Sequence, residues 1–552
     1  MSRTTISERG EAPVPEDGAG DGAAGRAGKG GLARASGAVA LVVAAGSAAL
    51  LSVGAFLGLY VRPTSDDWCA LWKTRDMGVL GIASDFYLTQ NGRVTNAFLT
   101  GLIYSDGTRG PKLLPAFLVV ALGAVLFLLA REALRALRLP FPAVAAAAAV
   151  LVLEALLFFA GTRSYQVLLW APATISHTLP SLIGLWAVLG AVWAARSGRR
   201  WARAASTGAA LLTGTAIGML SEPFALVGGA IAASVGLLCL PRFGWTENRY
   251  VSTWCAAACL GIAAGLVLLS TSPGARWRRA QHPPEPLSAA EVGETFHDWW
   301  RVWQTAGGQW AYLGAVTAGV LLGLGAAFLR TRTRTRTRPR ALAAVRVPPA
   351  AGPSRRPVLL VAALSPLPLI ALASLAVVYG LRSGYGVTGW TYARTWTSFL
   401  VPFLLTLCAY GAGLGLLLGR RLTTDPDPEP GTAPEPGTAP EPGTTPGSGT
   451  ASRTTVARVT ALVAAGASTL VCVAALVSPV QDLTTTTVAR SLAWDRQDAR
   501  VRSEAADGAR EATYRPLPIG HLAEPFFTTA YSRDWVAQCA SRYYGVSRIT
   551  RR

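Results

Sequence analysis

Apolar runs long enough to cross a membrane recur along the whole chain. A helix needs about 20 apolar residues to span the roughly 30 Å hydrocarbon core of a bilayer. Runs that approach this length lie near 37–60, 113–130, 141–160, 175–195, 205–221, 223–240, 250–271, 310–329, 357–379, 396–418 and 456–478. The pattern predicts an all-α, polytopic transmembrane protein of about eleven spans.

The number of spans depends on residues 205–240. Glu222 and Pro223 interrupt a long apolar stretch there, and a proline inside such a stretch ends or kinks a helix. The segment therefore predicts either two short spans or one broken helix. An odd total puts the chain ends on opposite sides of the membrane, whereas an even total would return the C-terminus to the side of the N-terminus.

The composition supports a membrane location. Hydrophobic residues make up 51% of the 552 residues, charged residues make up 15%, and the mean hydropathy is +0.35, which is too apolar for a soluble protein of this size. In a soluble chain, the net charge of +20 would suggest nucleic-acid binding. Here the basic residues fall between the apolar runs, so we expect the lipid bilayer as partner and no nucleic acid.

The distribution of arginine predicts the orientation. Clusters of arginine occur in alternate, mostly short connections, at 131–138, 196–203, 330–340 and 420–421. By the positive-inside rule these connections are cytoplasmic. The N-terminus is then cytoplasmic and the C-terminus extracytoplasmic. Only three of the 51 basic residues are lysines, a bias typical of GC-rich bacterial genomes, so we expect a bacterial cell membrane.

The predicted domain organisation follows from these assignments. Residues 1–36 are rich in Gly, Ala, Glu and Arg and are predicted to be disordered and cytoplasmic, and the apolar run after them is an uncleaved anchor. Residues 37–478 form the transmembrane domain, with a first extracytoplasmic loop at 61–112. Residues 479–552 are a polar extracytoplasmic region, too short for a large core of its own and expected to pack on the outer loops.

Two cytoplasmic inserts are low in complexity. The insert 419–455 contains PEPGTA-like repeats, which cannot bury a core and are typical of a spacer. The insert 330–356 is strongly basic. It is either a solvated loop or a segment that contacts anionic lipid headgroups.

Asp66 and Asp67 follow the first span directly and are the most distinctive polar residues of the chain. One interpretation is structural: Thr64, Ser65 or Asp66 caps an interfacial helix that begins near Asp67. The other is functional, because a carboxylate at the membrane surface can act as a catalytic base or bind a metal ion. The residues alone leave both interpretations open.

Other polar residues also allow two interpretations. Glu222 is either a functional intramembrane carboxylate or part of a buried structural hydrogen bond. Arg278, in the segment that begins at Pro273, and Arg394, just before the tenth span, either hold a phosphate or anchor the chain at the interface. Trp170 is either part of an interfacial aromatic belt or a surface for sugar stacking. His177 has no partners at metal-ligand spacing, so no metal site is predicted.

The cysteines predict one disulfide. Five of the seven lie in or at the ends of predicted spans, where they are packing residues. Cys69 and Cys539 remain, and in the predicted topology both face an oxidising compartment. We therefore predict a disulfide that joins the C-terminal region to the loop of Asp66 and Asp67.

The order of these motifs resembles an uncharacterised family of bacterial multi-pass membrane proteins that is distantly similar to the GT-C glycosyltransferases. In chain order, the shared features are Asp66-Asp67 with Cys69, Asn91-Gly92-Arg93, Glu222, Pro273-Gly274 with Arg278, Arg394, and a C-terminal Asp534-Trp535-Val536-Ala537-Gln538-Cys539 followed by Tyr543-Tyr544-Gly545. The resemblance covers roughly residues 37–552. This chain has Ala275 where the family usually has asparagine, so a ligand contact by that side chain is absent here.

The resemblance implies an inverting glycosyltransferase with a GT-C-like fold. It implies Asp66 or Asp67 as the catalytic acidic residue and a polyprenyl-phosphate-linked sugar as donor. The acceptor would be a cell-envelope glycan or glycolipid. Among the cations on the same side, Arg278 is the first choice for holding the donor phosphate, followed by Arg93 and Arg394, with Asn91, Glu222, Trp170 and His177 in support. No cofactor is required, although Mg²⁺ or Mn²⁺ between the carboxylates and the phosphate would suit this chemistry.

Two other functions remain open. A transporter or lipid flippase of the cell envelope would use Glu222 as a coupling carboxylate beside a broken helix. A non-catalytic scaffold of the cell envelope would keep the fold without the activity, and Ala275 favours this class.

Overall fold

The computed structural model describes residues 21–161, 163–240, 249–281, 288–336, 364–423, 448–520, 522–526 and 530–551. The predictions for residues 1–20 and for most of the two low-complexity inserts lie outside these ranges. The helix α1 begins at Asp21, within the segment predicted to be disordered. That segment is rich in alanine as well as glycine, and alanine favours a helix.

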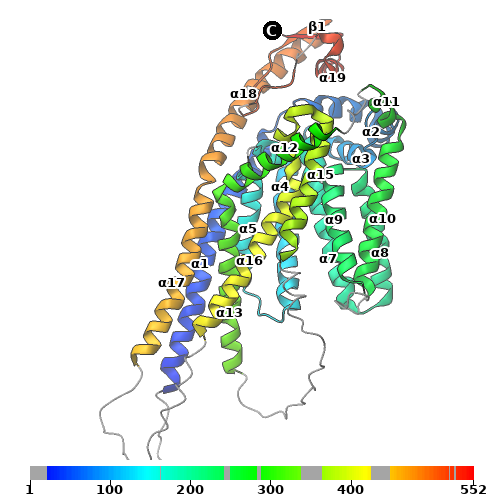
Figure 1. Cartoon of the computed structure of the whole chain (residues 1–552). Helices are drawn as coiled ribbons and strands as arrows, with labels where there is room; N and C mark the ends of the chain where they lie inside the picture. The colour runs from blue at the N-terminus through cyan, green and yellow to red at the C-terminus, as the bar shows by residue number, and fades with distance from the viewer. Residues whose placement is uncertain are drawn as a thin grey trace, which may run out of the picture.

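The described chain is almost entirely helical (Figure 1). The helices that run between the two ends of the bundle are α1 (Asp21–Leu57), α4 (Arg109–Ala136), α5 (Ala143–Phe159), α7 (Leu179–Ser197), α8 (Arg200–Gly218), α9 (Glu222–Leu238), α10 (Arg249–Thr271), α13 (Leu313–Arg336), α15 (Pro366–Tyr385), α16 (Thr397–Thr423) and α17 (Ser448–Ala474). The remaining α-helices are α2 (Asp66–Thr89), α3 (Val94–Tyr104), α6 (Ala171–His177), α11 (Pro273–Gln281), α12 (Ala289–Gly308), α18 (Val477–Ala506) and α19 (Trp535–Tyr544).

Short elements complete the fold. They are η1 (Gly58–Tyr60), the π-helix η2 (Tyr165–Leu169), η4 (Trp310–Tyr312), η5 (Gly386–Thr391), η6 (Ala393–Trp396), η7 (Tyr531–Arg533), and the strands β1 (Glu511–Tyr514) and β2 (Arg548–Arg551). The two strands pair in parallel, with Glu511 opposite Arg548. Both strands and α19 lie at the upper end of the bundle as drawn in Figure 1, together with α2, α3, α11 and α12.

The helices are those of a multi-pass membrane protein. Within the described residues, eight helical segments are long and apolar enough to cross a membrane, and α5 and α9 are apolar helices of 17 residues. Each of the eleven predicted runs coincides with one of the helices that connect the two ends. The number of crossings and their orientation stay predictions.

The turn at Glu222 separates two helices. The helix α8 ends at Gly218, and α9 begins at Glu222, so residues 205–240 form two short helices. Glu222 therefore lies at the upper end of the bundle, in the first turn of α9. The sequence alone could not distinguish this arrangement from one broken helix.

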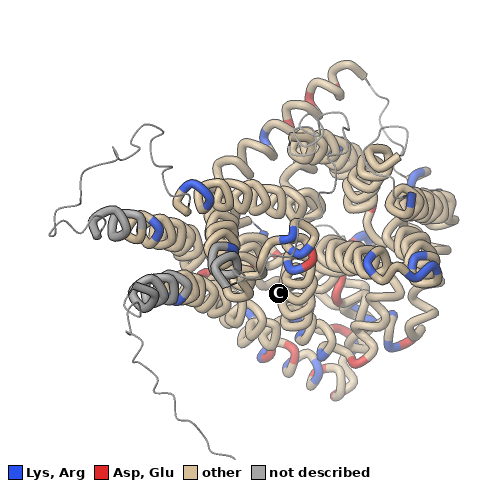
Figure 2. The backbone as a smooth tube through the Cα atoms, turned by 90° about the horizontal axis from the view of Figure 1, so that it is seen from below, with Lys and Arg blue, Asp and Glu red and all other residues tan. Residues whose placement is uncertain are grey.

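The outer surface of the helices is apolar. Large hydrophobic side chains such as Leu41, Val120, Leu212, Leu260 and Leu372 are more than half exposed, and exposed apolar side chains in such numbers are typical of a surface that contacts a membrane or another protein. Seen from below in Figure 2, most of the described backbone is free of charged residues, and basic residues occur at several helix ends. Both features support a bilayer as the surroundings of the bundle.

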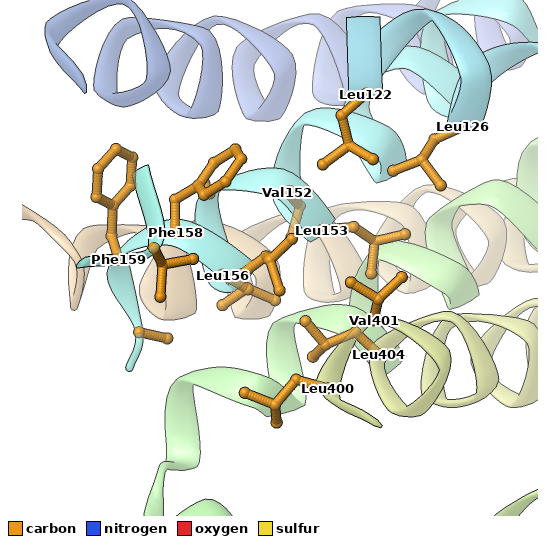
Figure 3. Close-up of a cluster of buried hydrophobic side chains, with 14 of the residues drawn as sticks. Leu122, Leu126, Val152, Leu153, Leu156, Phe158, Phe159, Leu400, Val401 and Leu404 are labelled. Atoms are coloured by element: carbon orange, nitrogen blue, oxygen red, sulfur yellow. The ribbon is translucent and has the colours of Figure 1, made fainter. Parts of the chain in front are cut away.

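The interior of the bundle is packed with branched and aromatic side chains from α4, α5 and α16 (Figure 3). Helix α5 is buried along almost its whole length, which explains why a 17-residue helix is tolerated at the centre. Leu122, Leu156, Phe158 and Leu404 are each 2% exposed or less. This core fixes the positions of the loops that these helices carry at the upper end.

Glycines bring α13 and α16 into direct backbone contact. A Cβ atom on Gly411 would lie 2.0 Å from the carbonyl oxygen of Val316, and one on Gly319 would lie 2.1 Å from that of Cys408. In lipid, where no hydrophobic force drives helices together, such close approach supplies the van der Waals contact that holds them. The pairing of α13 with α16 therefore depends on these glycines.

Replacing Gly411 by valine is expected to destabilise the bundle. The side chain would force the backbones of α13 and α16 apart, and overpacking of this kind costs about 1–3 kcal/mol. The expected result is a lower thermal unfolding temperature of the detergent-solubilised protein. Gly413→Val on the same helix is the control, because a Cβ atom at Gly413 meets nothing within 4 Å. Equal unfolding temperatures for the two variants would show that the close contact is not needed.

Candidate functional site

The candidate site begins at the turn between α1 and α2. Helix α2 starts at Asp66, and Ser65 before it has φ 48° and ψ −119°, a conformation that a non-glycine residue rarely adopts. The Ser65 side chain makes no capping hydrogen bond. Instead, the backbone N–H of Thr64 donates to Oδ2 of Asp67 at 2.9 Å. A helix does begin at this point, but the capping contact comes from Asp67 and not from Thr64, Ser65 or Asp66.

The two adjacent carboxylates have different surroundings. Asp67 is 3% exposed, and its other oxygen accepts a hydrogen bond from the hydroxyl of Tyr104. Asp66 is exposed to solvent. Asp67 is thus part of the framework of the turn, whereas Asp66 is free to meet a ligand.

Burial and nearby charges set the protonation of both carboxyl groups. Surrounding protein atoms raise the pKa of Asp66, and the positive charges of Arg394 and Arg93 oppose this rise. Burial raises the pKa of Asp67 to about 7, against the hydrogen bonds from Tyr104 and Thr64. Although Asp66 is accessible to water, surrounding protein atoms remove part of the solvation of its carboxylate, and this disfavours the charged form.

The raised pKa of Asp67 predicts that stability falls as pH rises. Between pH 3.8, the ordinary value, and about 7, the folded chain holds a proton that the unfolded chain releases. The rise in the pKa of Asp67 therefore makes folding more favourable at acidic pH than above pH 7, by up to about 4 kcal/mol. We expect the thermal unfolding temperature to decline from pH 5 to pH 7.5 in the wild-type protein and less in Asp67→Asn. Parallel declines in both proteins would contradict this assignment.

Two predicted cations lie near Asp66. Arg93 forms an ion pair with Glu222, with 2.9 Å between Nη2 and Oε2, so Glu222 balances a cation of the upper end. Arg394 lies over the rings of Trp170 and Tyr392, 5.2 and 5.0 Å from their centroids. Since the charges of Arg93 and Arg394 both act on Asp66, these side chains face the same region.

Arg163 adds a cation that the sequence did not indicate. It precedes the π-helix η2, and its pKa is lowered by burial and by the positive charge of Arg394. Among the described residues, neither Arg163 nor Arg394 forms an ion pair with a carboxylate within 4.0 Å. Two neighbouring cations without a paired carboxylate form a site with an excess of positive charge, which favours an anion.

An apolar pocket adjoins these cations. Its volume is about 140 Å³, and its wall is formed by the ends of α5, α12 and α16. Arg163 and Gln309 are among the polar residues of the lining, whereas Leu157, Trp396 and Leu400 contribute apolar atoms. Trp396 belongs to the same short helix as Arg394. The pocket therefore joins a hydrocarbon environment to a cationic one.

Arg278 and Asn91 are both associated with the segment that carries Arg93. Arg278 is exposed on α11 and lines an open pocket of about 320 Å³ with Thr89, Gln90 and Trp277. The side chain of Asn91 accepts a hydrogen bond from the backbone N–H of Arg93 at 3.0 Å, so it shapes the loop that carries Arg93. Arg93 and Arg394 are the predicted cations whose charges act on Asp66.

The Pro-Gly segment has a structural role in the loop of Arg93. Gly92 has φ 77°, and a Cβ atom there would lie 2.2 Å from Oγ of Ser272. The backbone N–H of Ala275 donates to the same Oγ at 3.2 Å, and the Ala275 side chain is buried. The family-like motifs at 91–93 and 273–275 thus pack against each other and fix the position of Arg93.

Trp170 and His177 flank the same region. Both lie at the ends of the short helix α6, and within the part of the chain that the structure describes, Nε1 of Trp170 and Nδ1 of His177 have no hydrogen-bond partner. The charges of Arg394 and Arg93 act on His177. Each side chain therefore presents a polar atom close to the cations.

The C-terminal region is attached directly to the turn of Asp66. Cys69 and Cys539, the pair predicted from the sequence, are joined by a disulfide with a Cα–Cα distance of 4.9 Å. Trp68 is fully buried and stacks on Trp494 at 6.0 Å, within a second hydrophobic cluster that the C-terminal region supplies. The small core of this region is therefore completed by the residue that follows Asp67.

Arg490 and Glu524 form a buried ion pair of 3.1 Å behind the turn, and no motif of the sequence marks either residue. Within the described ranges, no group of three or more His, Cys, Asp and Glu side chains is arranged to hold a metal ion.

No protein-family model matches the chain, and no curated protein or solved structure is significantly similar to it. The geometry of the site is therefore the basis for assigning a function.

Proposed function

We propose that the chain is a membrane glycosyltransferase that takes a sugar from a polyprenyl phosphate and transfers it to a cell-envelope glycan or glycolipid. The observation that carries the proposal is a pair of neighbouring cations that have no paired carboxylate among the described residues. Arg163 lines an apolar pocket, and the charge of Arg394 acts both on Arg163 and on the accessible carboxylate of Asp66. A polyprenyl phosphate has the matching chemistry, because it joins an anionic phosphate to a hydrocarbon chain. The GT-C-like motifs of the sequence agree with this donor.

Asp66 is the proposed general base. An acceptor hydroxyl attacks the anomeric carbon as its proton moves to the Asp66 carboxylate, and the bond between that carbon and the phosphate oxygen breaks. Such a base contributes about 10²–10⁴-fold to the rate. Asp67 supports the turn, because it is buried and both its oxygens accept hydrogen bonds from the protein.

Arg394 and Arg163 are the proposed partners of the departing phosphate. The phosphate gains negative charge as the glycosidic bond breaks, and fixed cations stabilise that charge more in the transition state than in the ground state. The charge of Arg93 is partly neutralised by its ion pair with Glu222, so Arg93 would add less positive charge to the phosphate site than Arg394 and Arg163 do. The oxygen atoms of Asp66 and of the phosphate would suit Mg²⁺ or Mn²⁺, but no step described here depends on a metal.

The side of the membrane follows from the donor. Nucleotide sugars are cytoplasmic, so a site that uses a lipid-linked sugar belongs on the extracytoplasmic face, in agreement with the arginine distribution. The formation of a disulfide in that compartment agrees as well. Labelling of a cysteine introduced at Asp106, beside α3, by an impermeant reagent added to whole cells would test this orientation.

The test of the proposed function uses the purified protein in liposomes that contain a radiolabelled polyprenyl-phosphate sugar. Transfer of label to an envelope glycan fraction that depends on Asp66 supports a glycosyltransferase. Movement of the labelled lipid between leaflets without transfer would instead identify a flippase, and Glu222 would then be the carboxylate to replace. Binding without transfer or movement would leave a scaffold as the function.

A further inference from the structure

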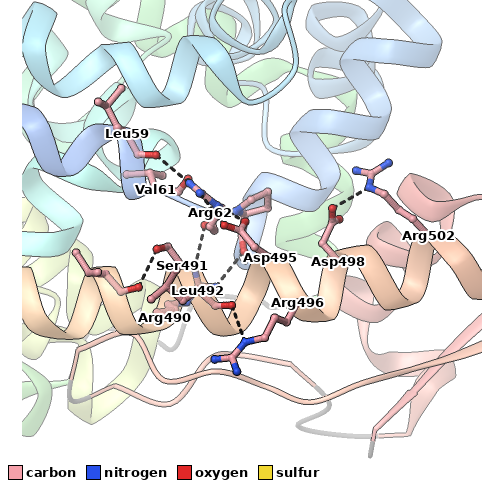
Figure 4. Close-up of polar contacts among 12 residues, drawn as sticks. Leu59, Val61, Arg62, Arg490, Ser491, Leu492, Asp495, Arg496, Asp498 and Arg502 are labelled. Carbon is pink, nitrogen blue, oxygen red and sulfur yellow. Dashed lines mark hydrogen bonds and ion pairs between the residues drawn. The ribbon is translucent and has the colours of Figure 1, made fainter.

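Buried side chains of the C-terminal region hold the backbone that precedes Asp66. Arg490 on α18 donates from Nη1 to the carbonyl oxygen of Arg62 at 3.1 Å and from Nη2 to that of Pro63 at 3.0 Å. Figure 4 shows Arg490 and Arg62 meeting between α18 and the end of η1. Arg62 itself forms two hydrogen bonds with the carboxylate of Asp495, of 2.6 and 3.0 Å. Consecutive residues of the turn are thus bound to one helix of the C-terminal region.

Glu524 completes the attachment from a second direction. Its side chain is fully buried and accepts hydrogen bonds from Nη2 of Arg490 at 3.1 Å, Oγ1 of Thr64 at 2.9 Å and the backbone N–H of Leu517 at 2.7 Å. The hydroxyl of Tyr514 donates to the same carboxylate. A buried carboxylate with this many donors has one well-defined position, and Thr64 is bound to it.

The attachment ends one residue before a strained position. Thr64 is bound to Glu524 through its hydroxyl and to Asp67 through its backbone N–H. Ser65, which lies between Thr64 and Asp67, has a positive φ. This conformation costs energy and persists only where the surrounding structure enforces it. Fixed contacts therefore lie on both sides of Ser65 and Asp66, and they determine where the exposed carboxylate of Asp66 points.

We propose that Arg490 and Glu524 are positioning residues for Asp66, so that the C-terminal region is part of the catalytic site and not a separate module. This inference rests on the proposed function. Removing the pair would let the turn relax and move Asp66 from its place beside Arg394, and a displacement of about 1 Å can cost 10²-fold in rate. The donor-binding cations are untouched, so the effect falls on kcat and not on the KM for the donor.

The experiment compares Arg490→Gln and Arg490→Lys with a matched control, Arg496→Gln. Arg496 lies on the same helix, but its side chain is exposed and donates to the carbonyl oxygen of Leu492 in its own helix. In nanodiscs with a polyprenyl-phosphate sugar, Arg490→Gln should lower kcat about 10–100-fold with the KM for the donor unchanged. Arg490→Lys, which keeps the charge opposite Glu524, should recover part of this loss, and Arg496→Gln should match the wild-type protein.

Hydrogen exchange of residues 61–72 supplies a readout that does not need activity. Arg490→Gln should exchange the amides of Thr64 and Asp67 faster than the wild-type and Arg496→Gln proteins do, with the Cys69–Cys539 disulfide still formed by mass spectrometry. If Arg490→Gln is not recovered with this disulfide, Glu524→Gln is measured in its place with the same expectations.

The outcomes separate this inference from the proposed function. An unchanged kcat in the variant of the pair, or an equal loss in Arg496→Gln, would overturn the inference while the wild-type activity stands. No donor turnover by the wild-type protein would instead count against the proposed function. In that case hydrogen exchange still tests whether Arg490 and Glu524 fix the turn, because unchanged exchange at residues 61–72 in the variant would overturn that role.

Discussion

Replacing Asp66 by asparagine is expected to lower the rate of glycosyl transfer by about 10²–10⁴-fold, the contribution of a general base. Asparagine keeps the size of the side chain but cannot accept the proton of the acceptor hydroxyl. Because Asp66 is exposed, the change should leave the fold and the disulfide intact. The measurement is kcat for transfer from a polyprenyl-phosphate sugar, with binding of the donor measured separately and expected to be unchanged.

Asp106→Asn is the matched control for this variant. Asp106 is an exposed carboxylate at the same end of the bundle, in the turn after α3, and its ion-pair partner among the described residues is Arg109, at 3.2 Å. This variant should transfer sugar at the wild-type rate. If Asp66→Asn were as active as Asp106→Asn, a role of Asp66 as the base would be excluded.

Replacing Arg394 by glutamine is expected to lower kcat/KM for the donor by about 10²–10³-fold. That is the effect of removing one fixed group that stabilises developing negative charge. Arg394→Lys should recover only part of the activity, because an ammonium group keeps the charge but loses the planar contact with Trp170. Arg548→Gln is the control, since Arg548 lies over the ring of Tyr531 at 5.2 Å in β2, within the C-terminal region.

The same variant should change the pH dependence of the rate. The charge of Arg394 lowers the pKa of Asp66, against the rise that burial causes. Without this charge, the pKa of Asp66 rises further, so the ionised base is lost at a higher pH. The acidic limb of the pH–rate profile should therefore move to higher pH in Arg394→Gln and stay in place in Arg548→Gln. A limb that stays in place in both variants would show that the charge of Arg394 does not reach the group that titrates.

The helices could be predicted from the sequence because each apolar run carries its own signal. Composition alone distinguishes a membrane-spanning segment from a loop. Each predicted run overlaps a helix of the described chain, and eight helical segments of the described residues are long and apolar enough to cross a membrane. The disulfide between Cys69 and Cys539 could also be predicted, because the other five cysteines lie in apolar segments. In both cases the deciding property belongs to the residue and its near neighbours.

The contacts around the turn could not be predicted in this way. Arg490 binds the backbone of residues more than 400 positions earlier, and neither Arg490 nor Glu524 has a local pattern that distinguishes it from a surface charge. Arg163 could not be predicted for the same reason, because its proximity to Arg394 arises from the packing of separate helices. Long-range contacts of this kind depend on the whole fold.

Arg278 is a predicted phosphate-binding residue whose position depends on the fold of its segment. Its place after a Pro-Gly pair made it the first choice for the donor phosphate, but the segment forms the helix α11, with Arg278 exposed beside Thr89 and Gln90. The buried part of the motif, around Gly274 and Ala275, packs against the loop of Arg93. The motif therefore supports a neighbouring cation, and Arg394 and Arg163 become the better candidates for the phosphate.

We propose that Asp66 serves the transfer of a lipid-linked sugar to the cell envelope. The most direct measurement is mass spectrometry of envelope glycans from a deletion strain that carries the wild-type chain, Asp66→Asn or Asp106→Asn. We expect one sugar to be missing in the deletion strain, restored by the wild-type and Asp106→Asn chains, and still missing with Asp66→Asn at equal expression. Identical glycans in all strains, or full restoration by Asp66→Asn, would contradict the claim.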